Sequence, residues 1–376
     1  MKINKITVHE VMVPTHPEAI ESKGMNKPLH KAAVGASEAW SIQFDELSKL
    51  MLKMELDDGI IGWGELYRAH DWRVVDRIAQ SLIGKDINTF TLQSLPFNFT
   101  REYDGFECAI WDAYAKAHGL RVVDLLGGPV KEMVKVGAWS GHRRVEDVGD
   151  LAIKYFEQGY DCIKFKCDLE DDVVSLCRGI QQAVPSMSVI LDPNERWENS
   201  GESRIRIREL QEIGNLLCLE DPIPRWKLNE FSRLRAYGSI PIALHISLPY
   251  IQHGQRIDNA IDAIQAEAVD GFNFNCGLAD FQRLDHVASA VGLPCWHGSE
   301  VDLGILEAMY VHSAAAAKSC VWPSDIFGQM IRSHDLLHEP LTFKPPYVEL
   351  PKGLGLGVEP DEDAIRHYQI NEKTYK

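Results

Sequence analysis

The sequence predicts an α/β fold, in which a (β/α)₈-type barrel carries an N-terminal α+β capping domain. From about Val134 onward, short apolar runs alternate with helical stretches at a spacing of roughly 20 to 30 residues, the length of a strand and its return helix. The apolar runs are continuous, as expected of parallel strands that are buried on both faces. A chain of 376 residues, 45% of them hydrophobic, is long enough for a barrel and one smaller domain.

The part before the barrel has a different pattern. Residues 5–13 and 50–56 alternate as half-buried strands, and residues 103–120 are typical of an amphipathic helix. We therefore expect the capping domain over residues 1–125. Within it, residues 15–40 are rich in Pro, Gly, His and Lys without a clear period, which favours a lid loop over a plain linker.

The barrel is expected over residues 126–328, and residues 329–376 are expected to pack back on the capping domain. The apolar runs predict eight barrel strands, and these lie in residues 134–141, 162–167, 188–194, 217–222, 240–247, 271–277, 293–299 and 320–328. Eight such units suffice for a closed barrel.

Composition excludes several classes of partner. The formal net charge of −16 disfavours nucleic acid and anionic membranes, and no apolar run reaches the roughly 18 residues of a membrane span. The N-terminal segment lacks the apolar stretch of a signal peptide. The eight cysteines form no CxxC pair, which favours buried, reduced thiols. We expect a cytoplasmic protein that acts on a small molecule.

Polar side chains recur where the predicted strands end, and the carboxyl ends of barrel strands are where catalytic groups lie. Asp192, Glu220 and His245 end three consecutive strands. Because adjacent strands are about 4.8 Å apart, these side chains can converge on one cation. A single aspartate after a strand can simply cap the following helix. That explanation does not account for polar groups at the ends of so many consecutive strands. Two carboxylates and an imidazole suit Mn²⁺, Fe²⁺ or Zn²⁺ better than Mg²⁺.

Lys164 and Lys166 are two residues apart on one predicted strand and therefore point to the same face. Two buried ammonium groups lower each other's pKa, which is how a lysine becomes a base near neutral pH. The alternative is a solvated lysine pair on an edge strand. Apolar Ile163 and Phe165 on the other face favour the buried arrangement.

At these residues the chain resembles the enolase superfamily, and within it the mandelate racemase and muconate lactonizing groups, whose fold is a modified TIM barrel with a cap. The resemblance spans nearly the whole chain and rests on several motifs together: CIKFKC, VILDPNERW, CLEDPIP, PIALHIS, LPCWHGSEVDLGI and SDIFG. It implies removal of a proton alpha to a carboxylate, giving an enediolate that is held by Mg²⁺.

The resemblance assigns roles to individual residues. Asp192 and Glu220 match the first two metal ligands, and Lys166 matches the base, with Lys164 tuning that base or stabilising the carboxylate. His297 resembles a histidine that serves as base for the opposite face or as acid for a β-hydroxyl. Asp325 matches an acid that hydrogen-bonds the enediolate.

Two departures from the family pattern follow. The third metal ligand is usually Asp or Glu, and His245 stands there instead, so that either His245 binds the metal or the ligand is lost. On the sixth strand, Asn273 and Asn275 stand where the family has an Asp or a Lys. An amide orients an imidazole without stabilising its charged form, which favours an acid role for His297.

Four functions compete. The first is a lyase that dehydrates a sugar acid or another hydroxy acid, and the second is a racemase, epimerase or cycloisomerase on the same scaffold. The third is a degenerate barrel that binds a metabolite without turnover, and the fourth is a Schiff-base barrel of another family. The family commonly forms homo-oligomers. Substrate contacts are expected from six side chains, which are His16, His30, Trp139, Asn194, Asn275 and Trp296.

Overall fold

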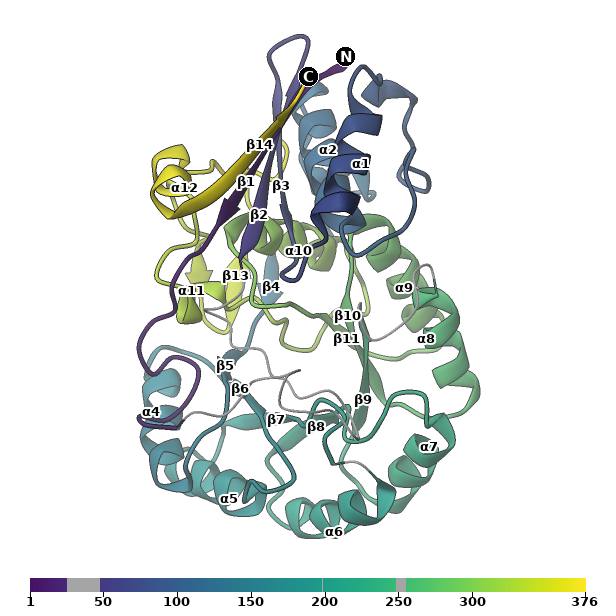
Figure 1. The fold of residues 1–376 in the computed structure, drawn as a ribbon. Helices are drawn as coiled ribbons and strands as arrows, with labels where there is room; N and C mark the ends of the chain where they lie inside the picture. The colour runs from purple at the N-terminus through teal and green to yellow at the C-terminus, as the bar shows by residue number, and fades with distance from the viewer. Residues whose placement is uncertain (26–47, 198, 248–254) are drawn as a thin grey trace.

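The computed structural model describes residues 1–25, 48–197, 199–247 and 255–376. Figure 1 shows a cap, in which α1 and α2 lie beside an antiparallel sheet, above a barrel. The cap sheet has the order β14-β1-β2-β3. Its elements are β1 (Ile3–Val11), β2 (Lys49–Leu56), β3 (Ile61–Leu66), α1 (Trp72–Leu82), α2 (Tyr103–Ala117) and β14 (Gln369–Tyr375).

Glycines let α2 lie directly on the cap sheet. A Cβ atom on Gly64 would lie 2.3 Å from the Gly105 carbonyl oxygen, and one on Gly62 would lie 2.2 Å from the Ala109 carbonyl oxygen. Both distances are far below van der Waals contact, so only glycine permits this approach. The alternation of glycine in β3 is therefore a packing requirement of the α2–β3 contact.

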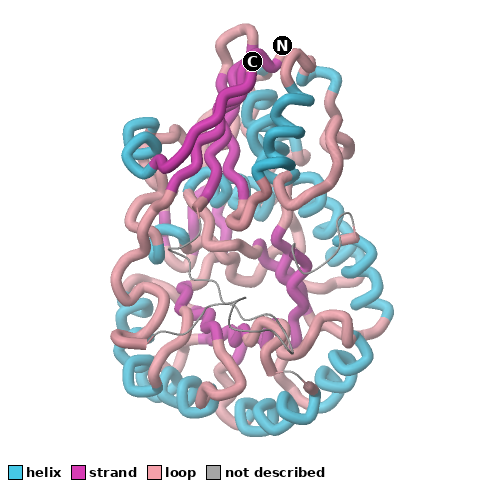
Figure 2. The backbone as a smooth tube through the Cα atoms, in the orientation of Figure 1, coloured by secondary structure: helices cyan, strands magenta, loops and turns pink. Residues whose placement is uncertain are grey.

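The barrel is a curled sheet of seven parallel strands in the order β11-β10-β9-β8-β7-β6-β5, and its helices form an outer ring (Figure 2). The strands are β5 (Ala138–Ser140), β6 (Cys162–Lys166), β7 (Ser188–Asp192), β8 (Leu216–Glu220), β9 (Ile242–Ser247), β10 (Gly271–Asn275) and β11 (Cys295–His297). The helices are α4 (Val148–Glu157), α5 (Val173–Ala183), α6 (Ser200–Gln211), α7 (Leu228–Tyr237), α8 (Arg256–Gln265), α9 (Leu278–Ala290) and α10 (Gly304–Ala316). The expected fold class is confirmed.

The eighth predicted strand, in residues 320–328, is not a strand. Isolated parallel bridges instead join Cys320 to Cys295 of β11 and Ser324 to Val136, just before β5, so this segment spans the gap between the two sheet edges. Pro323 interrupts it, and a proline has no N–H to donate to a ladder. The segment still delivers Asp325 to the barrel, because the Asp325 N–H donates to the His297 carbonyl at 2.8 Å.

The remaining elements are short. They are η3 (Ile87–Thr89), α3 (Val122–Leu125), β4 (Met133–Lys135), η4 (Val145–Asp147), α11 (Gly328–Ile331), β12 (Phe343–Lys344), β13 (Tyr347–Glu349) and α12 (Glu362–Tyr368). A small sheet of order β12-β13-β4 takes up the beginning of the first predicted barrel strand. The domain boundaries expected at residues 125 and 328 stay a prediction.

A buried ion cluster joins the cap to the barrel. The Lys49 ammonium group of β2 lies 2.9 Å from Glu65 of β3 and also pairs with Asp302, which precedes α10. Glu65 in turn accepts hydrogen bonds from the N–H groups of Leu303 and Leu306 at 2.8 and 3.1 Å. A carboxylate of the cap thus caps the N-terminus of a barrel helix, where negative charge is stabilising.

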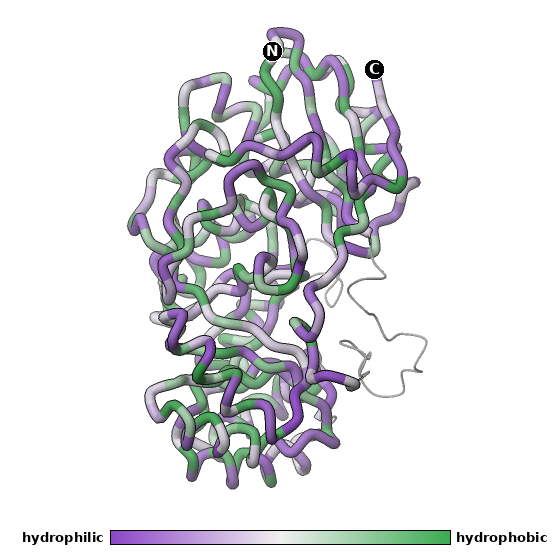
Figure 3. The backbone as a smooth tube through the Cα atoms, turned by 90° about the vertical axis from the view of Figure 1, so that its left-hand side faces the viewer, coloured by the Kyte–Doolittle hydropathy of each residue, from purple (hydrophilic) through white to green (hydrophobic). Residues whose placement is uncertain are grey.

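Among the described residues, no helix is long and apolar enough to cross a membrane. In Figure 3, hydrophilic and hydrophobic residues are interspersed along the cap and the barrel alike. All eight cysteines are buried and free, and burial raises the pKa of Cys167 and Cys218 well above the usual value.

Buried His312 makes the stability of the fold depend on pH. Its Nδ1 accepts from the Val123 N–H at 3.1 Å, and its Nε2 lies 3.0 Å from the Leu356 carbonyl. Burial lowers the pKa of His312 to about 4. His312 takes up a proton below about pH 6.5 in the unfolded state, but only below about pH 4 in the native state. We therefore expect the free energy of unfolding to fall as the pH falls from 6.5 to 4, by on the order of 3 kcal/mol.

Urea unfolding at several pH values measures this slope. A His312→Asn variant keeps an acceptor for Val123 but cannot titrate, so it should be less stable at pH 7 and should lose less stability in acid. A variant with the same slope as the wild type would contradict the assignment.

Candidate active site

Two lysines of β6 enter a cluster of buried carboxylates at the carboxyl end of the barrel. The Lys164 ammonium group lies 2.6 Å from Glu220, 2.7 Å from Asp325 and 3.4 Å from Asp192. The Lys166 ammonium group donates to Asp192 at 2.5 Å and to Asn194 at 2.7 Å. Both lysines lie on the same face of the strand, as the sequence predicts.

Burial and these charges move the pKa values of the cluster apart. Burial lowers the pKa of Lys166, and the neighbouring Lys164 ammonium lowers it further against the opposing charge of Asp192. Burial would also lower the pKa of Lys164, but Asp325 and Glu220 hold it well above its usual value. Burial and the nearby Asp192 raise the pKa of Glu220 to about 8. Burial raises that of Asp192 too, but the two lysines hold it below its usual range.

The three predicted metal ligands lie on consecutive strands β7, β8 and β9. Each is buried, and His245 Nδ1 lies 3.4 Å from Glu220 Oε1. Ligand atoms of Glu220, Asp221 and His245 lie within 4.8 Å of one another, whereas Asp192 is not in this group and pairs with the two lysines of β6. Burial, together with Arg225, lowers the pKa of His245 well below its usual value, so the imidazole is neutral, as a metal ligand must be. This donor set of oxygens and one nitrogen fits a divalent cation.

Asp221 is a member of this group to which the sequence motifs assigned no role. It directly follows Glu220, accepts from the His245 N–H at 2.9 Å and pairs with Arg225. Burial raises the pKa of Asp221 to about 7, against the opposing charge of Arg225. The φ angle of Asp221 is 43°, a left-handed conformation that is uncommon outside glycine. Asp221 thus fixes the backbone of His245, whose imidazole is the predicted metal ligand.

Asn273 and Asp325 close the cluster from the other side. The Asn273 amide donates to Glu220 at 2.8 Å and to Asp325 at 3.3 Å. The Asn273 amide on β10 therefore orients carboxylates. The sequence had suggested that it orients the His297 imidazole.

The position of His297 does not fit the expected acid or base role. Its ring stacks between Phe281 of α9 and Tyr310 of α10, with centroid distances of 4.4 and 4.0 Å, so it faces the outer helices. Its Nδ1 lies 2.8 Å from the Gly298 carbonyl, and burial lowers its pKa to about 4. The structure brings Trp296, one residue earlier, to the inner face instead.

The two predicted tryptophan contacts are packing residues. The Trp296 indole ring lies in the barrel interior with Cys162, Ile190, Cys218 and Ala243, and the Lys164 ammonium lies 5.7 Å from its centroid. Trp139 is 1% exposed and stacks on Phe327 at 5.3 Å. Neither side chain is presented to a substrate in this arrangement.

The other predicted contacts differ in position. Asn194 binds Lys166, as described. Both amide atoms of buried Asn275 lack a hydrogen-bond partner among the described residues. An unpaired buried amide is costly, so Asn275 is well placed to meet a ligand. His16 is exposed, and its N–H donates to the Ile331 carbonyl. His30 and most of the expected lid lie outside the described residues.

The fold and the site together define an enzyme of the enolase superfamily. Residues 147–364 match the enolase C-terminal domain-like family, and residues 41–127 match the N-terminal domain family of mandelate racemase and muconate lactonizing enzyme. The chain therefore belongs to the enolase superfamily, in its mandelate racemase and muconate lactonizing enzyme branch.

Curated relatives are distant and cover most of the chain. A chloromuconate cycloisomerase of Cupriavidus necator is 27% identical over 77% of this chain and 80% of its own length. A D-galactarolactone cycloisomerase of Agrobacterium fabrum is 26% identical over 89% of this chain and 94% of its own. A solved structure of N-succinyl Arg/Lys racemase from Bacillus cereus superimposes with a TM-score of 0.82 at 20% identity and covers all of both chains. The last comparison supports the fold.

Proposed function

We propose that this chain removes the proton alpha to the carboxylate of a small-molecule substrate, with Lys166 as the base. The observation that carries the proposal is the pair of β6 lysines projecting into carboxylates from β7, β8 and the segment of residues 320–328. Lys166 stands at the edge of this group, beside Asn194, whereas Lys164 is enclosed by it. Lys164 therefore holds the cluster, and Lys166 is the amine that can meet a substrate.

A divalent cation bound by Asp192, Glu220 and His245 would stabilise the negative charge of the enediolate. Family resemblance favours Mg²⁺, while the imidazole ligand favours Mn²⁺, Fe²⁺ or Zn²⁺. The protein groups that orient the substrate are the Asn275 amide and the Lys166–Asn194 pair.

The relatives support an isomerase as the overall reaction, because those compared above are two cycloisomerases and a racemase. Among the described residues, β10 contributes Asn273 and Asn275 and β11 turns Trp296 inward, so neither of these two strands supplies a second base for a racemase. Loss of a β-oxygen needs only one base. When that oxygen belongs to a lactone ring, no atoms leave, and the reaction is a cycloisomerisation.

Dehydration of a hydroxy acid is the second candidate. It begins with the same proton transfer, but the β-oxygen leaves as water. A ring carboxylate is a good leaving group by itself, whereas a hydroxyl group needs an acid.

A homo-oligomeric assembly and a cytoplasmic location also remain proposals for this chain.

Proton exchange with deuterated solvent tests the proposal. The wild-type chain is incubated with aldarolactones, muconolactones, N-acyl amino acids and aldonic acids, each with Mg²⁺, Mn²⁺ or Zn²⁺, and NMR follows the α-proton. We expect exchange in at least one substrate class, and only with a metal. A chain that binds none of these cations and exchanges no proton would instead be a barrel that binds a metabolite without turnover.

A further inference from the structure

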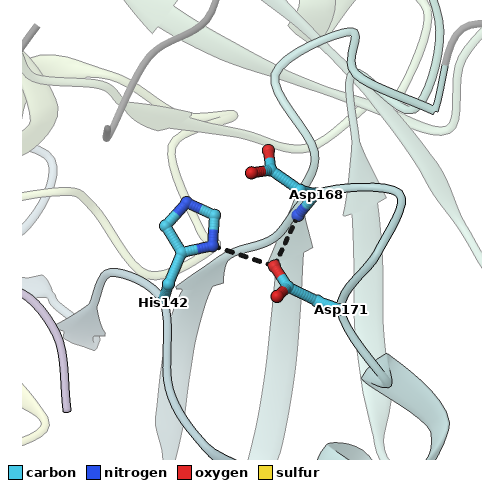
Figure 4. Close-up of side chains that lie close together, drawn as sticks. All are labelled: His142, Asp168 and Asp171. Carbon is cyan, nitrogen blue, oxygen red and sulfur yellow. Dashed lines mark hydrogen bonds and ion pairs between the residues drawn. The ribbon is translucent and has the colours of Figure 1, made fainter. Parts of the chain in front are cut away.

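A histidine and an aspartate from neighbouring strand ends form a dyad at the rim of the barrel. His142 follows β5, and Asp171 follows β6, the strand that carries the two lysines. His142 Nδ1 lies 2.9 Å from an Asp171 carboxylate oxygen, and the same oxygen accepts the Asp168 N–H at 2.7 Å (Figure 4). The carboxylate is thus fixed by the backbone before it orients the imidazole.

The other nitrogen of this imidazole has no evident partner. His142 is 1% exposed, and its Nε2 atom has no hydrogen-bond partner among the described residues. Figure 4 shows that this side of the ring is turned away from Asp171. Because Asp171 accepts the Nδ1 proton, Nε2 is the position that can take up and give a proton. A buried nitrogen without a hydrogen-bond partner is well placed to form a hydrogen bond with a polar atom of a ligand.

Neighbouring groups support a proton donor at this place. A carboxylate that accepts from Nδ1 stabilises the charged imidazolium. Asp168 is engaged by Arg196, which limits the excess of negative charge beside the dyad. The His142 carbonyl accepts the N–H of Ser22 at 3.3 Å, so a segment of the cap docks on this same residue.

We propose that the His142–Asp171 dyad protonates the β-oxygen that departs from the substrate, which gives the chain a hydro-lyase activity. This rests on the proposed α-proton removal by Lys166. It fills the acid role that His297 cannot take from its position between Phe281 and Tyr310. His142 follows β5 and Lys166 is the last residue of β6, and these two strands are neighbours in the sheet.

The step balances as follows for a 2,3-dihydroxy acid. Lys166 takes the α-proton, and the C–H electron pair remains on the substrate as the enediolate. That pair then forms the Cα–Cβ double bond as the Cβ–O bond breaks, and the imidazolium of His142 gives its Nε2 proton to the oxygen, which leaves as water. The enol product becomes a 2-keto acid. Lys166 then loses a proton to solvent, and His142 regains one.

The test measures proton exchange and water loss separately. Full-length chains are given five- and six-carbon aldonic and aldaric acids with Mg²⁺ or Mn²⁺ in deuterated water. NMR reads α-proton exchange, and 2-keto acid release reads dehydration. In His142→Asn we expect exchange to persist within a few-fold, while dehydration falls by about 10²- to 10⁴-fold. Asp171→Asn should show the same split. His118→Gln, a change of an exposed histidine, is the control.

Each outcome decides the matter. If the wild type exchanges the α-proton and forms no 2-keto acid, or if His142→Asn dehydrates as fast as the wild type, the dyad is not the acid and the base assignment stands. A loss of dehydration in His297→Asn, with His142→Asn unaffected, would return the role to His297. If the wild type neither exchanges the α-proton nor forms a 2-keto acid, the proposed function and the dyad's role both fail. Return of dehydration in His142→Gly on adding imidazole would support the dyad, because a purely structural residue is not rescued in this way.

Discussion

Replacement of Lys166 by methionine is expected to lower α-proton exchange by about 10²- to 10⁴-fold, the range that a positioned general base contributes. Methionine keeps the length and the apolar stem of lysine and removes the amine that lies 2.5 Å from Asp192. Lys164 remains within 3.4 Å of that carboxylate, so the cluster keeps one cation. The rate is measured by NMR at saturating substrate and metal.

The matched control for this change is Lys135→Met. Lys135 lies on β4 and pairs with partly exposed Asp161 at 2.8 Å, away from the cluster. We expect this variant to exchange the α-proton as the wild type does. Equal rates in Lys166→Met and Lys135→Met, in variants of equal thermal stability, would exclude Lys166 as the base.

The second large effect is expected on stability. Lys49→Met should lower the free energy of unfolding by about 3 to 5 kcal/mol, because it leaves Glu65 and Asp302 buried without their cation. Lys49 is 2% exposed, and both carboxylates are fully buried. Tyr310 donates to Asp302 at 2.7 Å and can compensate only in part. Chemical denaturation, followed by fluorescence, measures the change.

Lys53→Met is the control on the same strand. Lys53 pairs with Glu362, which is 46% exposed, so this loss should cost about 1 kcal/mol or less. Similar losses in the two variants would show that the buried cluster is not what joins cap and barrel. A double variant, Lys49→Met with Asp302→Asn, should recover part of the stability, because one uncompensated charge is removed.

The sequence was sufficient to predict that the lysine pair and two carboxylates lie at the carboxyl end of the barrel, but it assigned the carboxylates to a metal ion and not to the lysines. Apolar runs mark the strands that carry these residues; Lys164 and Lys166 are two residues apart on one of them and so share a face, and Asp192 and Glu220 end the next two. The barrel itself was predictable for the same reason. Its eighth strand was not, because Pro323 reduces that segment to single bridges, and a short apolar run does not reveal whether a ladder forms.

His297 shows where such reasoning ends. Its strand has only three residues and is buried on both faces, so no alternation of polar and apolar residues fixes which side chain points inward. A shift of one residue exchanges Trp296 and His297. The His142–Asp171 contact was equally out of reach, because it joins two loops that are 29 residues apart and depends on their folded positions.

The pairing of β1 with β14 sets an order on how the protein matures. Figure 1 shows the two strands side by side, and residues such as Thr7 and Thr374 are partners although 367 positions separate them. On the ribosome, β1 and β2 emerge early, while the strand that covers the free edge of β1 is translated only after the whole barrel. Until then that edge is open to other strands, which is a known route to aggregation. Chaperone demand during synthesis should therefore fall only once β14 is released.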